Sequence, residues 1–231
     1  MIIWHGVPSN EVPVIVEHPP NRDIPRRKFE VISIPGRNGD ILIPQDAYEN
    51  ITQVYEIHIP SNRPRLDRAI RNVTDWLLVS GYNRLEDSYE PDVFRIAYYA
   101  GQHDIENILN KGGKATIEFN CRPERWLKAG EQPIVLSAGS SIYNPTNQTA
   151  KPLIKVSGAG EGELTVGTYN LTMTDCDEIF LDSEEEDAYR EGENMNATVA
   201  GAFPLLQPGA VDVSWSGGVT GVTIIPRWWT I

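Results

Sequence analysis

Runs of β-branched and aromatic residues recur through the first hundred or so positions and predict β-strands. Two such arms, 29–34 and 41–43, flank the segment Pro35-Gly36-Arg37-Asn38-Gly39. Because proline presets φ while glycine and Asn-Gly accept positive φ, this segment predicts a turn and the two arms a β-hairpin. The same pattern predicts further strands over 51–59, 92–99 and 114–121.

A single stretch has the spacing of a helix. Its apolar residues recur every three or four positions and are Leu66, Ala69, Ile70, Val73, Trp76 and Leu77. Since the residues between them are polar, we expect an amphipathic helix that packs one face on a sheet. Gly81 is expected to end this helix.

Beyond residues 128–131 the pattern changes to short β segments separated by Gly, Pro, Asn and Asp about every ten residues, which is typical of a β-sandwich. We predict strands over 153–156, 163–166, 169–173, 178–181, 188–190, 209–215 and 222–226. The predicted fold class is therefore mainly β with one clear helix. We expect two domains, a strand-plus-helix domain over residues 1–130 and a sandwich over residues 131–231.

A glycine-rich segment, Gly158-Ala159-Gly160-Glu161-Gly162, superficially resembles a dinucleotide-binding loop. It lacks the third glycine at the required offset, and a strand-like run follows where a dinucleotide site needs a helix N-terminus. We therefore expect a tight hairpin turn here and no bound nucleotide.

Composition and charge narrow the class of protein. The chain of 231 residues is 40% hydrophobic and 23% charged, as in globular proteins, and its 19 Gly and 17 Pro argue against an all-helical fold. Residues 1–130 hold 16 Lys and Arg against 18 Asp and Glu, whereas residues 131–231 hold 4 against 14. Most of the net charge of −12 thus lies in the second part, which disfavours electrostatic binding of nucleic acid there.

The sequence also bears on membranes and export. No apolar run approaches the roughly 18 residues of a membrane span, so no membrane partner is expected. The N-terminal residues lack the basic and apolar regions of a signal peptide, and we expect synthesis in a cytosolic compartment.

No known catalytic motif is present. The run from Asp182 to Asp187 carries five carboxylates without the glycine spacing of a calcium loop, so we interpret it as a solvated acidic turn. The four histidines, His5, His18, His58 and His103, are isolated, and Cys121 and Cys176 lie far apart. We predict no catalytic residue, no metal and no cofactor.

Three tryptophans, Trp215, Trp228 and Trp229, lie near the C-terminal end. Exposed indoles would suit a sugar-binding face or a protein interface. Neighbouring residues of a strand point to opposite sides, so core packing is expected for at least one of Trp228 and Trp229.

Six segments then occur in order along the chain: Ile34-Pro-Gly-Arg-Asn-Gly39, Trp76-Leu77, Gly81-Tyr82 with Leu85-Glu-Asp-Ser-Tyr89, Phe119-Asn-Cys-Arg-Pro123, Lys151-Pro152 with Val156-Ser-Gly158, and Pro226-Arg-Trp-Trp229. Together they resemble the distal tail protein family of bacteriophages with long, non-contractile tails, including prophages. The resemblance implies a ring, usually a homohexamer, that joins the tail tube protein to the tail-tip or baseplate machinery at the distal end of the virion's tail. It also implies an N-terminal ring domain with a projecting hairpin and a galectin-like C-terminal sandwich.

Under this interpretation the functional site is an interface between subunits. We expect it to include the positively charged residues at the base of the hairpin and the residues of its turn. These are Arg26, Arg27, Lys28, Pro35, Gly36, Arg37, Asn38 and Gly39. The expected partners are other copies of the chain, the tail tube protein, a tail-tip or baseplate hub or tail-associated lysin protein, and phage DNA as passing cargo.

Two other function classes stay open at this point. A carbohydrate-binding module would use Trp215, Trp228 or Trp229 to stack on sugar rings, although the second half leaves no room for an inserted sugar-binding domain. A wall hydrolase with paired carboxylates is the third hypothesis.

Overall fold

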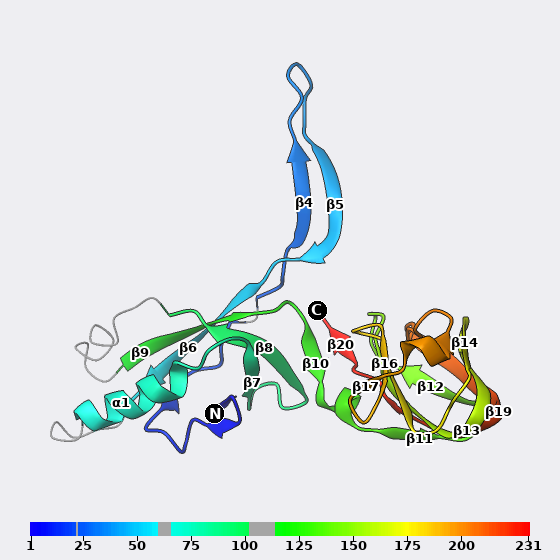
Figure 1. The fold of residues 1–231 in the computed structure, drawn as a ribbon. Coiled ribbons are helices and arrows are strands. Elements are labelled where there is room, and N and C mark those ends of the chain that lie inside the picture. Colours follow the sequence, from blue (N-terminus) through cyan, green and yellow to red (C-terminus); the bar gives the residue numbers. More distant parts are fainter. Residues whose placement is uncertain (22, 60–65, 102–113) are drawn as a thin grey trace. The chain divides into compact units, whose positions relative to one another are not determined.

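The computed structural model describes residues 1–21, 23–59, 66–101 and 114–231 (Figure 1). Its residues divide into two compact units, Met1–Arg125 with Ile231, and Trp126–Thr230. The described residues form many strands and a single α-helix, which confirms the predicted fold class. No helix within the described ranges is long and apolar enough to cross a membrane.

An antiparallel sheet organises the first unit. Seven of its strands lie in the order β2 (Val7–Pro8), β1 (Ile2–Trp4), β7 (Asn83–Asp87), β8 (Val93–Tyr99), β9 (Lys114–Cys121), β6 (Ile51–His58) and β3 (Ile15–Val16). Burial alternates along β6, with Tyr55 and Ile57 buried and Glu56 exposed between them. One face of the sheet therefore builds a core and the other meets solvent.

Helix α1 (Leu66–Leu77) ends where the apolar spacing predicts, and it contributes to the core of this unit. Val73 and Trp76 are buried there, and the Trp76 indole N–H donates to the Val7 carbonyl oxygen at 3.1 Å. Gly81 has a positive φ of 75° but lies four residues beyond the helix, so the expectation that it ends α1 is wrong. It bends the chain just before β7.

The predicted hairpin is present as β4 (Arg27–Ile32) and β5 (Ile41–Tyr48). Within the described residues, these two strands pair only with each other and form a separate two-stranded sheet. They contribute no residue to the buried core of the first unit.

The second unit is a β-sandwich, as predicted. Its strands are β11 (Ile134–Leu136), β12 (Ser140–Asn144), β13 (Leu153–Val166), β14 (Tyr169–Met173), β15 (Ile179–Asp182), β16 (Asp187–Arg190), β17 (Glu193–Asn194), β18 (Val199–Ala200) and β19 (Gly209–Ile225). Short 3-10 turns occupy Lys128–Glu131 and Asn196–Thr198, and β10 (Arg125–Leu127) pairs with β20 (Trp229–Thr230) at the ends of the unit.

The long strands β13 and β19 pair along their length and run through both layers of the sandwich. The first part of β13 pairs with β15 and its last part with β14, while the first part of β19 pairs with β12 and its last part with β11. Both parts contribute to one buried core, for example Ile154 and Val166 from β13 and Val213 and Ile224 from β19.

The glycine-rich segment does not form the predicted hairpin turn. It lies inside β13, where the register with β19 shifts between the pairs Gly158–Val219 and Gly162–Gly217. A Cβ on Gly218 would meet the Ala159 carbonyl oxygen at 1.9 Å, so glycine is required for the two backbones to approach. The segment is a bulge in one continuous strand. The strands predicted over 153–156 and 163–166 are present as two parts of β13, and those over 209–215 and 222–226 fall on two parts of β19, but the predicted breaks between them are wrong.

Candidate assembly surface

The turn of the hairpin has the local chemistry that its sequence predicts. The Arg37 backbone N–H donates to the Ile34 carbonyl oxygen at 3.1 Å and closes a turn around Pro35 and Gly36. Gly36 and Gly39 have φ values of 83° and 82°, where other L-residues are strained.

The register between the strands puts apolar side chains on both faces of the hairpin. Phe29 lies opposite Pro44 and Val31 opposite Leu42, so these four residues share one face. Ile32 lies opposite Ile41 and Glu30 opposite Ile43 on the other face. Glu30 is the one charged residue among these eight positions.

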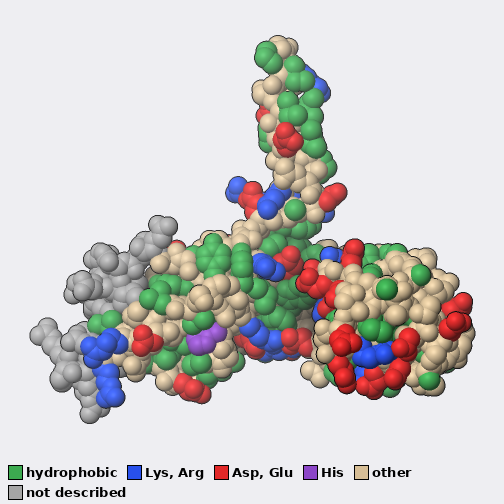
Figure 2. Space-filling model, viewed as in Figure 1, with side chains coloured by type: hydrophobic (Ala, Val, Ile, Leu, Met, Phe, Trp, Pro, Cys, Tyr) green, Lys and Arg blue, Asp and Glu red, His purple; other side chains and the backbone are tan. Residues whose placement is uncertain are grey.

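These apolar side chains are exposed to solvent. The exposed fractions are 46% for Phe29, 58% for Val31, 58% for Leu42 and 43% for Ile43. Figure 2 shows hydrophobic side chains over the surface of β4 and β5. Isolated two-stranded hairpins are marginally stable in water, and contiguous exposed apolar surface marks interaction sites. The hairpin therefore has the properties of a surface that another molecule covers.

The predicted interface residues fall into two groups at opposite ends of the hairpin. Arg26, Arg27 and Lys28 are exposed at the base, where the Arg27 guanidinium lies 5.3 Å from the centre of the Tyr48 ring. Residues 35–39 are exposed at the turn. The structure thus does not bring Arg37 together with the three basic residues at the base of the hairpin.

The strand residues between these groups were not among the predicted site residues. Their signal was present, because Val31-Ile32 and Ile41-Leu42-Ile43 are consecutive apolar residues. A hairpin with one solvent face would alternate apolar and polar residues, so consecutive apolar residues indicate that both faces are covered.

The tryptophans of the second unit belong largely to its core. Trp228 is only 4% exposed, which corrects the expectation that it offers a ring face to a sugar. Trp215 and Trp229 are half-buried against the same core, and the Trp229 indole N–H donates to the Thr149 carbonyl oxygen at 2.9 Å. Stacking of a sugar on Trp215 or Trp229 stays a prediction.

The acidic run from Asp182 to Asp187 forms the turn between β15 and β16. The prediction that the whole run is solvated is wrong for its first residue, because Asp182 is buried. Asp182 accepts two hydrogen bonds from the Arg227 guanidinium, at 2.7 and 2.8 Å, and a third from the Glu184 backbone N–H at 2.9 Å. Burial acts to raise the pKa of Asp182, but these hydrogen bonds outweigh it and lower the pKa below its usual value. Asp182 therefore holds the turn against the end of β19.

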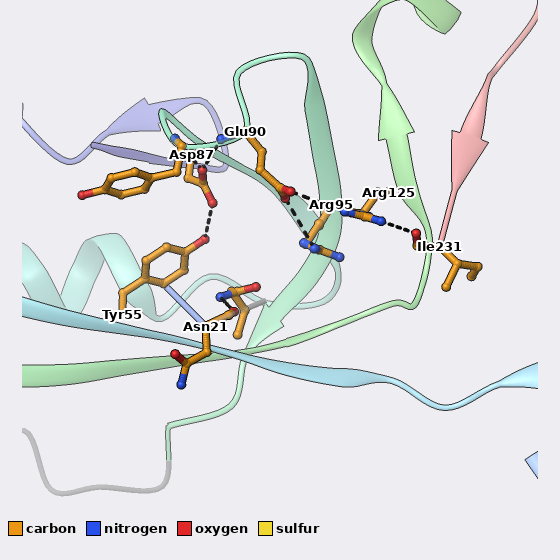
Figure 3. A network of polar contacts seen from close by, with 9 residues as sticks. Asn21, Tyr55, Asp87, Glu90, Arg95, Arg125 and Ile231 are labelled. Carbon is orange, nitrogen blue, oxygen red and sulfur yellow. Dashed lines mark hydrogen bonds and ion pairs between the residues drawn. The ribbon is translucent and has the colours of Figure 1, made fainter. Parts of the chain in front are cut away.

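A polar network in the first unit is also structural (Figure 3). The Tyr55 hydroxyl donates to Asp87 at 3.0 Å, and the other carboxylate oxygen of Asp87 accepts the backbone N–H groups of Tyr89 and Glu90. Glu90 pairs with Arg95 and Arg125, and Arg125 also donates to Ile231. Burial, helped by Asp87, raises the pKa of Tyr55, so its hydroxyl stays protonated as a donor.

The cysteines do not form a nucleophilic site. Cys121 and Cys176 are both buried and unbonded to each other. Burial raises the pKa of the Cys121 thiol to about 12, so it is protonated at neutral pH.

One group of three side chains among the described residues has the donor atoms of a metal site. It consists of Glu17, His18 and Glu56, whose ligand atoms all lie within 4.8 Å of one another. Sequence spacing did not predict it, because Glu56 lies far from Glu17 and His18 along the chain. Of the other histidines, His103 lies outside the described residues.

Comparison with known proteins gives one family model and one solved structure that are similar to this chain. Residues 13–121 match the family model of the phage tail protein RIFT-related domain. The structure is similar to the crystal structure of the Dit protein of phage SPP1, with a TM-score of 0.78 and 13% sequence identity over 100% of this chain and 98% of that chain. That protein is described as a paradigm of the hub adsorption apparatus in phages that infect Gram-positive bacteria. No curated protein sequence matches the chain.

Proposed function

We propose that this chain, which carries the phage tail protein RIFT-related domain, is a structural hub that forms a homomeric ring at the distal end of a phage tail. In this role it joins the tail tube protein to the tail-tip or baseplate proteins that act on the host, without catalysing a reaction. The β4–β5 hairpin supplies the contacts between neighbouring copies.

The observation that carries the proposal is the apolar hairpin. Its two strands expose apolar side chains on both faces and pair with no other strand among the described residues. A neighbouring copy that covers these faces removes apolar surface from water, which stabilises both the hairpin and the assembly.

The form of the contact favours a ring over a pair. In the proposed arrangement, a different surface of the next chain receives the hairpin, which makes the contact head-to-tail. Head-to-tail contacts form a ring where the rotation between neighbouring copies closes, and the closed ring has a central hole. The similarity of fold to Dit, which is described as a paradigm of the hub adsorption apparatus, supports the role of a hub.

The proposed hole is a passage for phage DNA. DNA carries dense negative charge, so a surface that lets it slide must not be strongly basic. The part of the chain over residues 1–130 has a net charge of −2, which is compatible with passage of DNA without capture. A tail-tip or baseplate hub or tail-associated lysin protein would dock at the far side of the ring.

A charge placed on the hairpin tests the proposal. In Val31→Glu a carboxylate enters the apolar face formed with Leu42, and burial of that charge opposes assembly. Val135→Glu is the matched control, because Val135 is a strand residue of the second unit that is 79% exposed.

Light scattering over a concentration series measures the mass of each variant, and circular dichroism checks that each is folded. We expect the wild type and Val135→Glu to assemble alike and Val31→Glu to remain a folded monomer. Equal assembly of all three proteins would contradict the role of the hairpin.

A further inference from the structure

Two glutamates of the first unit face each other across neighbouring strands. β3 pairs with β6 through Ile15–His58 and Val16–Ile57. The ladder continues for one more residue, because the Glu17 backbone N–H donates to the Glu56 carbonyl oxygen at 2.9 Å. Residues directly opposite in an antiparallel pair carry their side chains on the same face.

A cation bound between the two carboxylates would attract both of them. Like charges directly opposite destabilise a strand pair, whereas a shared cation reverses the sign of the interaction. Glu56 and His18 are exposed and Glu17 is half-buried, so a cation can reach them from solvent. The imidazole of His18 lies beside both carboxylates, with all three ligand atoms within 4.8 Å of one another.

We propose that Glu17, His18 and Glu56 bind a divalent transition-metal ion, with Zn²⁺ as the best fit. An imidazole nitrogen combined with carboxylate oxygens suits Zn²⁺, whereas Ca²⁺ and Mg²⁺ take oxygen ligands. Three protein ligands leave at least one position of the metal for water or for a group from another molecule.

To bind Zn²⁺ together, the three side chains need to move slightly closer to one another. A tetrahedral metal with bonds of about 2.1 Å separates its ligand atoms by about 3.4 Å. Rotation of exposed glutamate and histidine side chains spans such a difference at little cost.

A metal bound here would stabilise the pairing of the edge strand β3 with β6. β3 is two residues long and forms two residue pairs with β6, so few backbone contacts retain it. A metal held by residues 17, 18 and 56 would link the segment after β3 to the middle of β6. The inference is independent of the proposed ring, because all three ligands come from one chain.

The test uses the full chain treated with a chelator and then titrated with ZnCl₂ in a calorimeter. We expect one Zn²⁺ per chain and a rise in melting temperature when it binds. His18→Ala and Glu56→Gln should each weaken binding by at least the roughly 10- to 100-fold that loss of a supporting residue costs at metal sites.

Two controls remove the same chemical groups from the same sheet. His58 lies on β6 two residues from Glu56, and Glu118 lies opposite Val54 on β9, yet neither belongs to the three-residue group. His58→Ala and Glu118→Gln should therefore bind Zn²⁺ as the wild type does. Absence of Zn²⁺ binding, or equal binding by His18→Ala and His58→Ala, would overturn the proposal.

Discussion

The pair of Asp182 and Arg227 allows a quantitative prediction about the sandwich. In Asp182→Asn the turn keeps an oxygen that can accept the Glu184 backbone N–H, but Arg227 loses its charged partner. Breaking a buried pair costs about 3–5 kcal/mol, whereas exposed pairs contribute at most about 1 kcal/mol. The side chains of Asp182 and Arg227 are 11% and 27% exposed, so we expect a loss between these limits, about 2 kcal/mol.

The effect should depend on pH in a defined direction. The pKa of Asp182 is lower in the folded protein than its unfolded value of about 3.9, so ionised Asp182 stabilises the folded state above that pH. As pH falls through the folded pKa, the carboxylate is protonated and this contribution is lost. The difference in stability between wild type and Asp182→Asn should therefore be largest near neutral pH and shrink below about pH 4.

Thermal and urea unfolding at several pH values measure this difference. A loss of about 2 kcal/mol corresponds to a fall in melting temperature of roughly 4–8 °C for a chain of this size. Glu184→Gln is the control, because Glu184 and Lys151 form an ion pair at 3.5 Å in which both side chains are about half exposed. Equal effects of the two substitutions, or no change of the difference with pH, would refute the reasoning.

Further predictions concern packing, a buried hydrogen bond, the hairpin turn and sugar binding. Gly218→Ala should destabilise the sandwich by about 1–3 kcal/mol or more in urea unfolding, whereas Gly221→Ala, whose Cβ meets nothing within 4 Å, should not. Tyr55→Phe should cost about 1–2 kcal/mol in the same assay, because one carboxylate oxygen of Asp87 loses its hydrogen-bond donor. Gly36→Ala should weaken assembly measured by light scattering, because φ is positive at Gly36 and alanine is strained there. Unchanged assembly would contradict a role of the turn in the contact between copies. Tryptophan fluorescence should not change when host-wall polysaccharide is added; a saturable change would favour the sugar-binding alternative.

Local patterns predicted much of the fold because they depend on neighbouring residues. The end of α1 at Leu77 follows from its apolar spacing, and the hairpin turn follows from the φ preferences of Pro35, Gly36 and Gly39. The bulge in β13 was not predictable in the same way. Glycine permits both a hairpin turn and a close approach of two strands, and only the pairing with β19 decides between them.

In the candidate sites too, local sequence predicts some features, whereas others depend on contacts between residues that are distant along the chain. The location of the hairpin could be predicted, but which residues form its two apolar faces depends on the register of Val31 with Leu42. The role of Asp182 could not be predicted, because Arg227 lies 45 positions away along the chain. For the same reason, the meeting of His18 with Glu56 depends on the pairing of β3 with β6.

The central claim is that copies of this chain assemble into a ring, and imaging of the purified wild-type protein tests it most directly. Negative-stain class averages, with the mass from light scattering on the same sample, report both symmetry and copy number. The account predicts closed rings, six-fold by resemblance to the distal tail family, with a central hole. Closed two-fold dimers or open filaments would contradict it. A protein that stays monomeric at all concentrations, with or without its tail tube partner, would do so as well.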